Sequence, residues 1–135
     1  MNRLVLFFVS VAFLSCSSSQ KKGAEETATE FTSYILSDMP EEAFKLLDKD
    51  SRGRLEKLAS VDKSGTVKPW EMLVIAPQAR EKWSGAKKIQ TLSSDDTGKI
   101  ISVGAGEKNK IQLKVVREKG LWKVSLPQGK FVSGQ

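Results

Sequence analysis

The sequence predicts an α+β domain in which short N-terminal helices pack on a curved C-terminal antiparallel sheet. Between residues 28 and 83 the apolar side chains recur at intervals of three and four, as on one face of a helix. Beyond Gly85 they alternate with polar side chains, as in strands. Helices followed by a run of short strands are typical of α+β domains.

The first helix is indicated by Ala28, Phe31 and Ile35, whose spacing places them on one helical face. Asp38 is expected to cap a second helix, because its carboxylate can accept hydrogen bonds from free amides, and Pro40 suits the first turn. The apolar face is expected to continue through Ala43, Phe44 and Leu47.

A third helix is expected after Asp50, with Asp48 and Asp50 acting at the helix boundary. Pro69 and Pro77 can each open a further helical turn, the second ending at Gly85. The positions expected to face inward in these segments are Leu55, Leu58, Ala59, Leu73 and Val74.

Four strands are expected in the second half, around residues 89–91, 100–103, 110–117 and 122–126. Turn residues separate them at 94–98, 104–107 and 118–120. The third strand has the clearest alternation. One of its faces has Ile111, Leu113 and Val115, the other has Lys110, Gln112 and Lys114; in the fourth strand Trp122, Val124 and Leu126 are expected inward.

The N-terminus has the order of an export signal. Arg3 precedes a predominantly apolar run over residues 4–14, and Ser15 and Cys16 follow it. This run is shorter than the roughly 20 residues that a helix needs to cross a bilayer. Residues 1–15 are therefore expected to be a signal peptide.

The segment from Phe13 to Cys16 resembles a lipobox, in which a small residue precedes a cysteine that receives diacylglycerol before cleavage. The usual lipobox has leucine where this chain has Phe13. The resemblance implies a lipoprotein anchored to the membrane through Cys16, and Ser17 after it implies an outer-membrane location in the cell envelope. The alternative is an ordinary secretory signal with an incidental cysteine.

The expected organisation after the signal has three parts. Residues 16–26 are the lipidated cysteine and a flexible polar tether, residues 27–126 the folded domain, and residues 127–135 a tail. Cys16 is the only cysteine, so no disulfide is expected in the domain.

Residues 37–44, the alternating third strand and the ending at residues 118–124 together resemble small envelope lipoproteins of the nuclear transport factor 2-like (cystatin-like) superfamily. The resemblance implies a cone-shaped α+β domain with an open mouth. It also implies that a homodimer formed through the open sheet face is one available state.

Catalysis is not expected. The chain contains no histidine, so acid–base chemistry near neutral pH would depend on a buried carboxylate or lysine. Asp95 and Asp96 are adjacent, but they lack the alternating oxygen spacing of a calcium loop and fit a turn better. We therefore predict no enzyme activity, no metal and no cofactor; a small isomerase or hydrolase using a buried carboxylate is the alternative.

Two groups of residues are candidates for binding. Trp70 and Trp83 lie where the resemblance places the mouth of the cone, and Tyr34 on the first helix could point into the same cavity. These three residues are the candidate pocket, for which burial in the core is the alternative.

The second group is a candidate basic face formed by Lys110, Lys114 and Lys123, which alternation places on the outer side of the sheet. An ordinary solvated face is the alternative. The full chain has a net charge of +6, and removal of Arg3 with the signal leaves +5 (21 − 16), which suits contact with anionic headgroups; an exported protein is not expected to bind nucleic acid.

The predicted function is therefore that of a membrane-anchored envelope lipoprotein whose domain binds, without catalysis, a small apolar ligand or an envelope protein. A surface-exposed adhesin that uses the basic face on host glycans or matrix proteins is the alternative from a different class.

Overall fold

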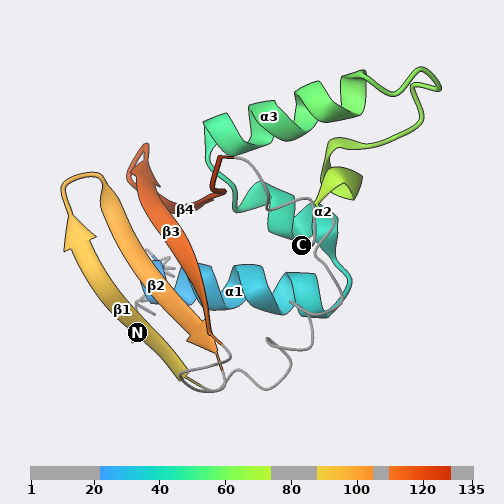
Figure 1. Ribbon diagram of the computed structural model, residues 1–135. Helices are drawn as coiled ribbons and strands as arrows, with labels where there is room; N and C mark the ends of the chain where they lie inside the picture. Colours follow the sequence, from blue (N-terminus) through green and yellow to red (C-terminus); the bar gives the residue numbers. More distant parts are fainter. Residues whose placement is uncertain (1–21, 74–87, 105–109, 129–135) are drawn as a thin grey trace, which may run out of the picture.

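The computed structural model describes residues 22–73, 88–104 and 110–128 (Figure 1). Its helices precede a four-stranded antiparallel sheet, which confirms the predicted α+β class. The helical elements are α1 (Ala24–Leu36), α2 (Pro40–Lys45), α3 (Lys49–Ser60) and the 3-10 turn η1 (Pro69–Met72). The strands are β1 (Lys88–Asp95), β2 (Gly98–Gly104), β3 (Lys110–Glu118) and β4 (Leu121–Ser125).

The sheet is a simple meander, because its strands lie in the order β1-β2-β3-β4 and every neighbouring pair is antiparallel. The turn between β3 and β4 consists of Lys119 and Gly120, both with positive φ (51° and 79°), as a tight hairpin requires. β1 and β4 are therefore opposite edges of the sheet.

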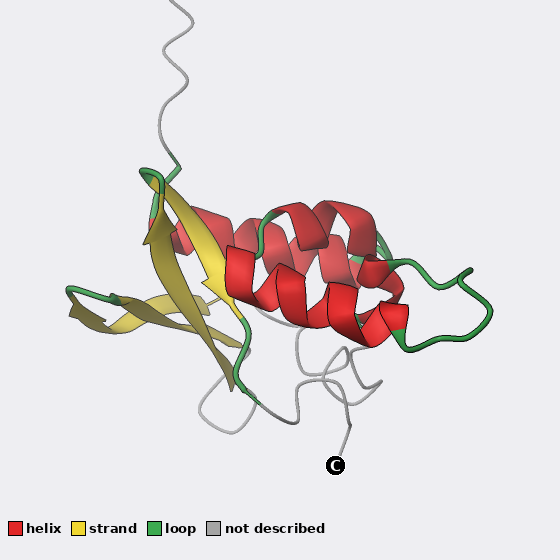
Figure 2. Ribbon diagram, turned by 90° about the horizontal axis from the view of Figure 1, so that it is seen from above, coloured by secondary structure: helices red, strands yellow, loops and turns green. Residues whose placement is uncertain are grey.

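The helices lie together on one side of the sheet, as the view from above shows (Figure 2). α1 crosses this face and contacts all four strands, and α2 packs against α1. η1 contacts both α2 and α3. The architecture is thus two layers, with the core between α1 and the sheet.

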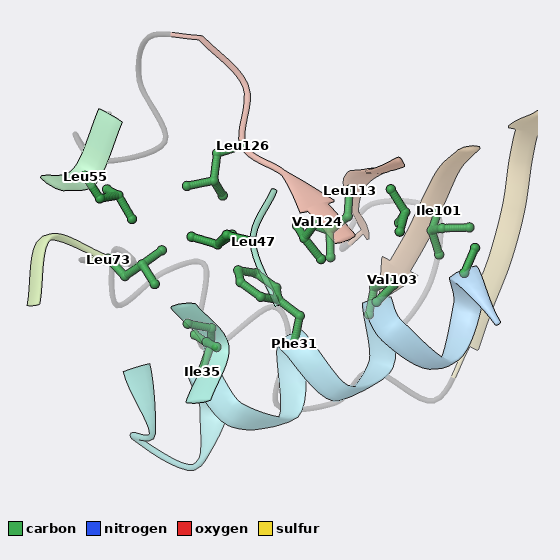
Figure 3. Close-up of a cluster of buried hydrophobic side chains, with 14 residues drawn as sticks. Phe31, Ile35, Leu47, Leu55, Leu73, Ile101, Val103, Leu113, Val124 and Leu126 are labelled. Carbon is green, nitrogen blue, oxygen red and sulfur yellow. The ribbon is translucent and has the colours of Figure 1, made fainter. Parts of the chain in front are cut away.

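The core is a continuous cluster of apolar side chains around Phe31, which is fully buried and points toward Leu47 and Val124 (Figure 3). Leu113 and Val115 are buried while Gln112 and Lys114 are exposed, so the alternation predicted for the third strand is confirmed at these positions. The buried cluster consists of Ala24, Ala28, Phe31, Ile35, Ala43, Leu47, Leu55, Leu73, Ile101, Val103, Leu113, Val115, Val124 and Leu126.

Two helix predictions are wrong. Asp38 does not cap α2: its φ is 61°, and Met39 is the N-cap residue, without a side-chain cap. Leu58, expected inward, is 44% exposed, because α3 buries only the stripe that contains Leu55 and Ala59.

The N-terminal boundary also differs from the expected one. α1 begins at Ala24, which is buried, so residues 24–26 are helical although the tether was expected to include them. The helical turn expected from Pro77 to Trp83, Val74 and the tail beyond residue 128 lie outside the described residues.

The segment between α2 and α3 is joined to the edge of β4. Leu47 forms a parallel bridge with Val124, and hydrogen bonds run from the Asp48 amide to the Val124 carbonyl (2.9 Å) and from the Val124 amide to the Leu46 carbonyl (2.8 Å). The Ser51 hydroxyl then accepts from the Leu126 amide at 2.8 Å. These bonds fix α3 beside the end of β4.

Asp48 caps α3, since its carboxylate accepts a hydrogen bond from the Ser51 amide at 2.8 Å. Replacing Asp48 by alanine is expected to lower the free energy of unfolding by about 1 kcal/mol, because this buried cap is lost. The control Asp50→Ala, at an exposed position in the first turn, is expected to cost less than half as much. Equal losses in urea unfolding would contradict the assignment of Asp48 as the cap.

Alanine substitution is expected to change the stability of the protein in opposite directions at two glycines. A Cβ at Gly98 would overlap the Val115 carbonyl oxygen, so Gly98→Ala is expected to cost roughly 1–3 kcal/mol. A Cβ at Gly53 in α3 would meet no atom within 4 Å. Gly53→Ala is therefore expected to stabilise the protein by about 0.5–1 kcal/mol, because glycine disfavours the helix. Thermal unfolding of both variants tests the two signs.

Candidate binding surface

A groove of about 520 Å³ lies between α3 and the chain that leaves β4. One side comes from α3, from Lys49 to Lys57, and the other from the end of the sheet, because the hydrogen bond between Ser51 and Leu126 holds the two together. The lining residues are Lys49, Asp50, Gly53, Arg54, Lys57, Ser125, Leu126 and Gln128.

The charge of the groove is predominantly positive, with three basic side chains against the single carboxylate of Asp50. Lys49 and Lys57 are exposed, and within the described residues neither amine forms an ion pair or a hydrogen bond. Two lysine amines thus border the groove with their charges available to a ligand.

Arg54 has a structural role in the same groove. Its guanidinium donates to the carbonyl oxygens of Leu126 (2.5 Å) and Pro127 (3.1 Å), and lies 3.3 Å from the Ser51 hydroxyl. These bonds hold the chain after β4 against α3. Arg54 therefore positions the wall of the groove.

The candidate pocket residues do not line this groove. The Tyr34 hydroxyl is partly buried and donates to Glu30 at 2.9 Å. Trp70 is also partly buried and packs edge-on against Phe44, with ring centroids 6.3 Å apart and an interplanar angle of 65°. Trp83 lies outside the described residues. Tyr34 and Trp70 thus have separate partners.

Tyr34 belongs to a small network on α1. The Glu30 carboxylate accepts from the amine of Lys22 as well as from Tyr34, and its pKa is lowered chiefly by the bond from Lys22. The same carboxylate raises the pKa of Tyr34 and that of Lys22, through a hydrogen bond to each. This network links Lys22, which precedes α1, to the middle of the helix.

The candidate basic face is not a uniform stripe. Lys114 is exposed on β3, opposite Ser125 of β4. Lys123 shares that side by register, but its amine turns around the edge of the sheet and donates to the Lys45 carbonyl at 2.9 Å, near the end of α2. Lys110 pairs with Gly104 in the sheet, and its side chain lies outside the described part of the chain.

Trp122, expected in the core, is only partly buried. Two cations lie near its ring: the Lys99 amine at 5.3 Å and the Arg117 guanidinium at 5.0 Å from the centroid. This ring therefore covers the edge of the core and attracts cations through its π-electrons.

The acidic turn contains Asp95, whose carboxylate accepts from the Thr97 amide (2.7 Å), the Thr97 hydroxyl (2.6 Å) and the Gly98 amide (3.0 Å). These bonds, first of all that from the Thr97 hydroxyl, lower the pKa of Asp95. The predicted turn role of Asp95 is confirmed. The residues that the structure describes contain no group of three side chains suited to a metal ion.

The groove residues were not recognised from the sequence, although one signal for them was present. Lys49, Gly53 and Lys57 follow one another at intervals of four, which places them on one helical face. That pattern is common on solvated helices. Only the position of α3 beside Ser125 and Leu126 turns this face into the wall of a groove.

Glu30→Gln is expected to reduce the free energy of unfolding by about 0.5–1 kcal/mol at neutral pH, because a partly exposed ion pair is lost. Since the folded-state pKa of Glu30 is lowered, this contribution is fully present above the ordinary value of 4.5 and disappears as the pH falls through the folded pKa. Denaturant unfolding across this acidic range measures it. A difference from wild type that persists at the acidic end would contradict the prediction, and Glu26→Gln, an exposed change on α1, is the control.

Comparison of the chain with protein-family models, curated proteins and solved structures finds no significant match. Among the described residues, no helix has both the length and the apolar character needed to cross a bilayer.

Proposed function

We propose that this chain is a lipid-anchored protein of the cell envelope whose domain is a non-catalytic binding module. The observation that carries the binding role is the basic groove beside α3, in which the amines of Lys49 and Lys57 are available to a partner. Fixed walls and unpaired charge are what a recognition surface needs.

The anchor is proposed from the order of the N-terminal residues, in which an apolar run ends at Cys16. Only residues 17–23 separate Cys16 from α1. A lipid on Cys16 would keep the domain next to the membrane, and Ser17 favours the outer membrane.

A nuclear transport factor 2-like fold is part of the proposal. The two-layer arrangement, with α1 across one face of an antiparallel meander, agrees with it (Figure 1). In this chain the space between α1 and the sheet holds apolar side chains such as Phe31 and Leu113. Binding at the surface groove is therefore favoured over binding inside the cone.

The apolar interior also argues for binding rather than for acid–base catalysis. The described titratable groups with shifted pKa values, among them Glu30, Asp62 and Asp95, have local hydrogen bonds that account for the shifts. None of these three carboxylates lines the groove.

The anchor is tested by growing bacteria that express the full chain with a clickable palmitate analogue. Wild-type protein is expected to carry the label and to partition into detergent, whereas Cys16→Ser is expected to lose both properties, because the sulfur that carries the lipid is gone. Ser17→Ala is the matched control and should remain labelled. Unlabelled wild type released by the cells as a water-soluble protein would refute the anchor and favour an ordinary secretory signal.

A further inference from the structure

The groove and the N-terminus of the domain lie at opposite edges of the sheet. At the β1 edge, the carboxylate of Glu25 in the first turn of α1 accepts from the Thr91 amide (3.1 Å) and hydroxyl (2.5 Å). At the β4 edge, Ser125 and Leu126 line the groove. α1 therefore begins at the edge of the sheet away from the groove.

Charge does not set this orientation, because anionic headgroups repel the exposed carboxylates of Glu25 and Glu26 at the start of α1. A short connection to the membrane brings this end of the domain closest to the bilayer. The groove, with Lys49 and Lys57, then faces away from the anchoring membrane.

We infer that the groove binds an acidic, extended polypeptide segment of a partner protein. Only the orientation of the groove away from the membrane rests on the proposed anchor; the choice of ligand rests on the side chains of the groove. Carboxylates complement Lys49 and Lys57, the hydroxyl of Ser125 and the amide of Gln128 can hydrogen-bond to a peptide backbone, and Leu126 contributes an apolar wall.

Gly53 supports a polypeptide occupant. It lies between Lys49 and Lys57 on α3 and lines the groove, and a side chain there would meet nothing in the domain within 4 Å. No contact within the described fold requires glycine at this position, although glycine weakens a helix. Its absent side chain leaves the floor open, so that another backbone can approach α3 closely.

The helix also sets the spacing of the acidic residues in the partner. Lys49 and Lys57 are two helical turns apart, which corresponds to about 12 Å along α3. An extended chain rises about 3.3 Å per residue, so acidic residues about four positions apart would reach both amines from one face.

The test uses the mature lipidated protein in neutral phosphatidylcholine nanodiscs and the anisotropy of a fluorescent peptide with two aspartates four positions apart. Binding is expected to weaken with added salt and to disappear when asparagine replaces both aspartates. The double variant Lys49→Glu with Lys57→Glu is expected to weaken binding about tenfold or more.

Matched variants distinguish an effect of the groove on binding from an effect of the protein's net charge. Lys63→Glu with Lys68→Glu changes two exposed lysines outside the groove by the same charge and is expected to leave affinity within about twofold. Gly53→Phe keeps every charge but fills the floor, so it is expected to weaken binding as well. Circular dichroism confirms that each variant is folded.

Three outcomes would overturn the inference. The first is that the acidic peptide does not bind, and the second is that the groove variant and the control variant lose equal affinity. The third is that the groove lysines are needed for binding to separate phosphatidylglycerol vesicles but not to the peptide, which would identify a membrane as the occupant. Failure of palmitate labelling with peptide binding intact would instead refute the proposed anchor and leave the groove's ligand unchanged.

Discussion

The structure depends above all on the pairing of residues 46–48 with the edge of β4. Two backbone hydrogen bonds between this segment and Val124 bring the helical half of the chain onto the sheet. Leu47 is completely buried at this pairing. Asp48, the next residue, is thereby placed where its carboxylate caps α3. One short segment thus closes the β4 edge, contributes to the core and sets the start of a helix.

The groove is a consequence of the same pairing. Once α3 starts at the end of β4, Ser51 and Arg54 hold the backbone around Leu126 and Pro127 against the helix. Their bonds satisfy polar groups that would otherwise be left without partners near the core. The face of α3 that includes Gly53 then stays open, bordered by lysines with no ion pair in the described structure.

The two edges of the sheet are protected differently. β1 has a register shift between Thr91 and Ser93, and its Thr91 amide is bonded to Glu25 of α1. β4 is covered by its backbone pairing with residues 46–48. Each arrangement occupies backbone groups that a free edge would offer to another strand. Glu25 thus lies beside β1, whereas Lys49, Arg54 and Lys57 lie beside the end of β4.

The sequence by itself determined the type and order of the elements, because hydrophobic periodicity and turn residues are local. It predicted α1, the meander and the inward face of β3, and Pro40 in the first turn of α2. It failed at Asp38 and Leu58, where the positive φ and the direction of α3 depend on packing between elements.

The candidate binding surface was decided only by the tertiary structure. Tyr34 and Trp70 suggested a pocket from their residue type, yet each has its own partner, Glu30 and Phe44 respectively. The groove joins residues of α3 to residues at and after the end of β4, which lie about seventy positions later in the sequence. Periodicity can place a lysine on a helical face, but only the packing of distant segments determines what that face meets.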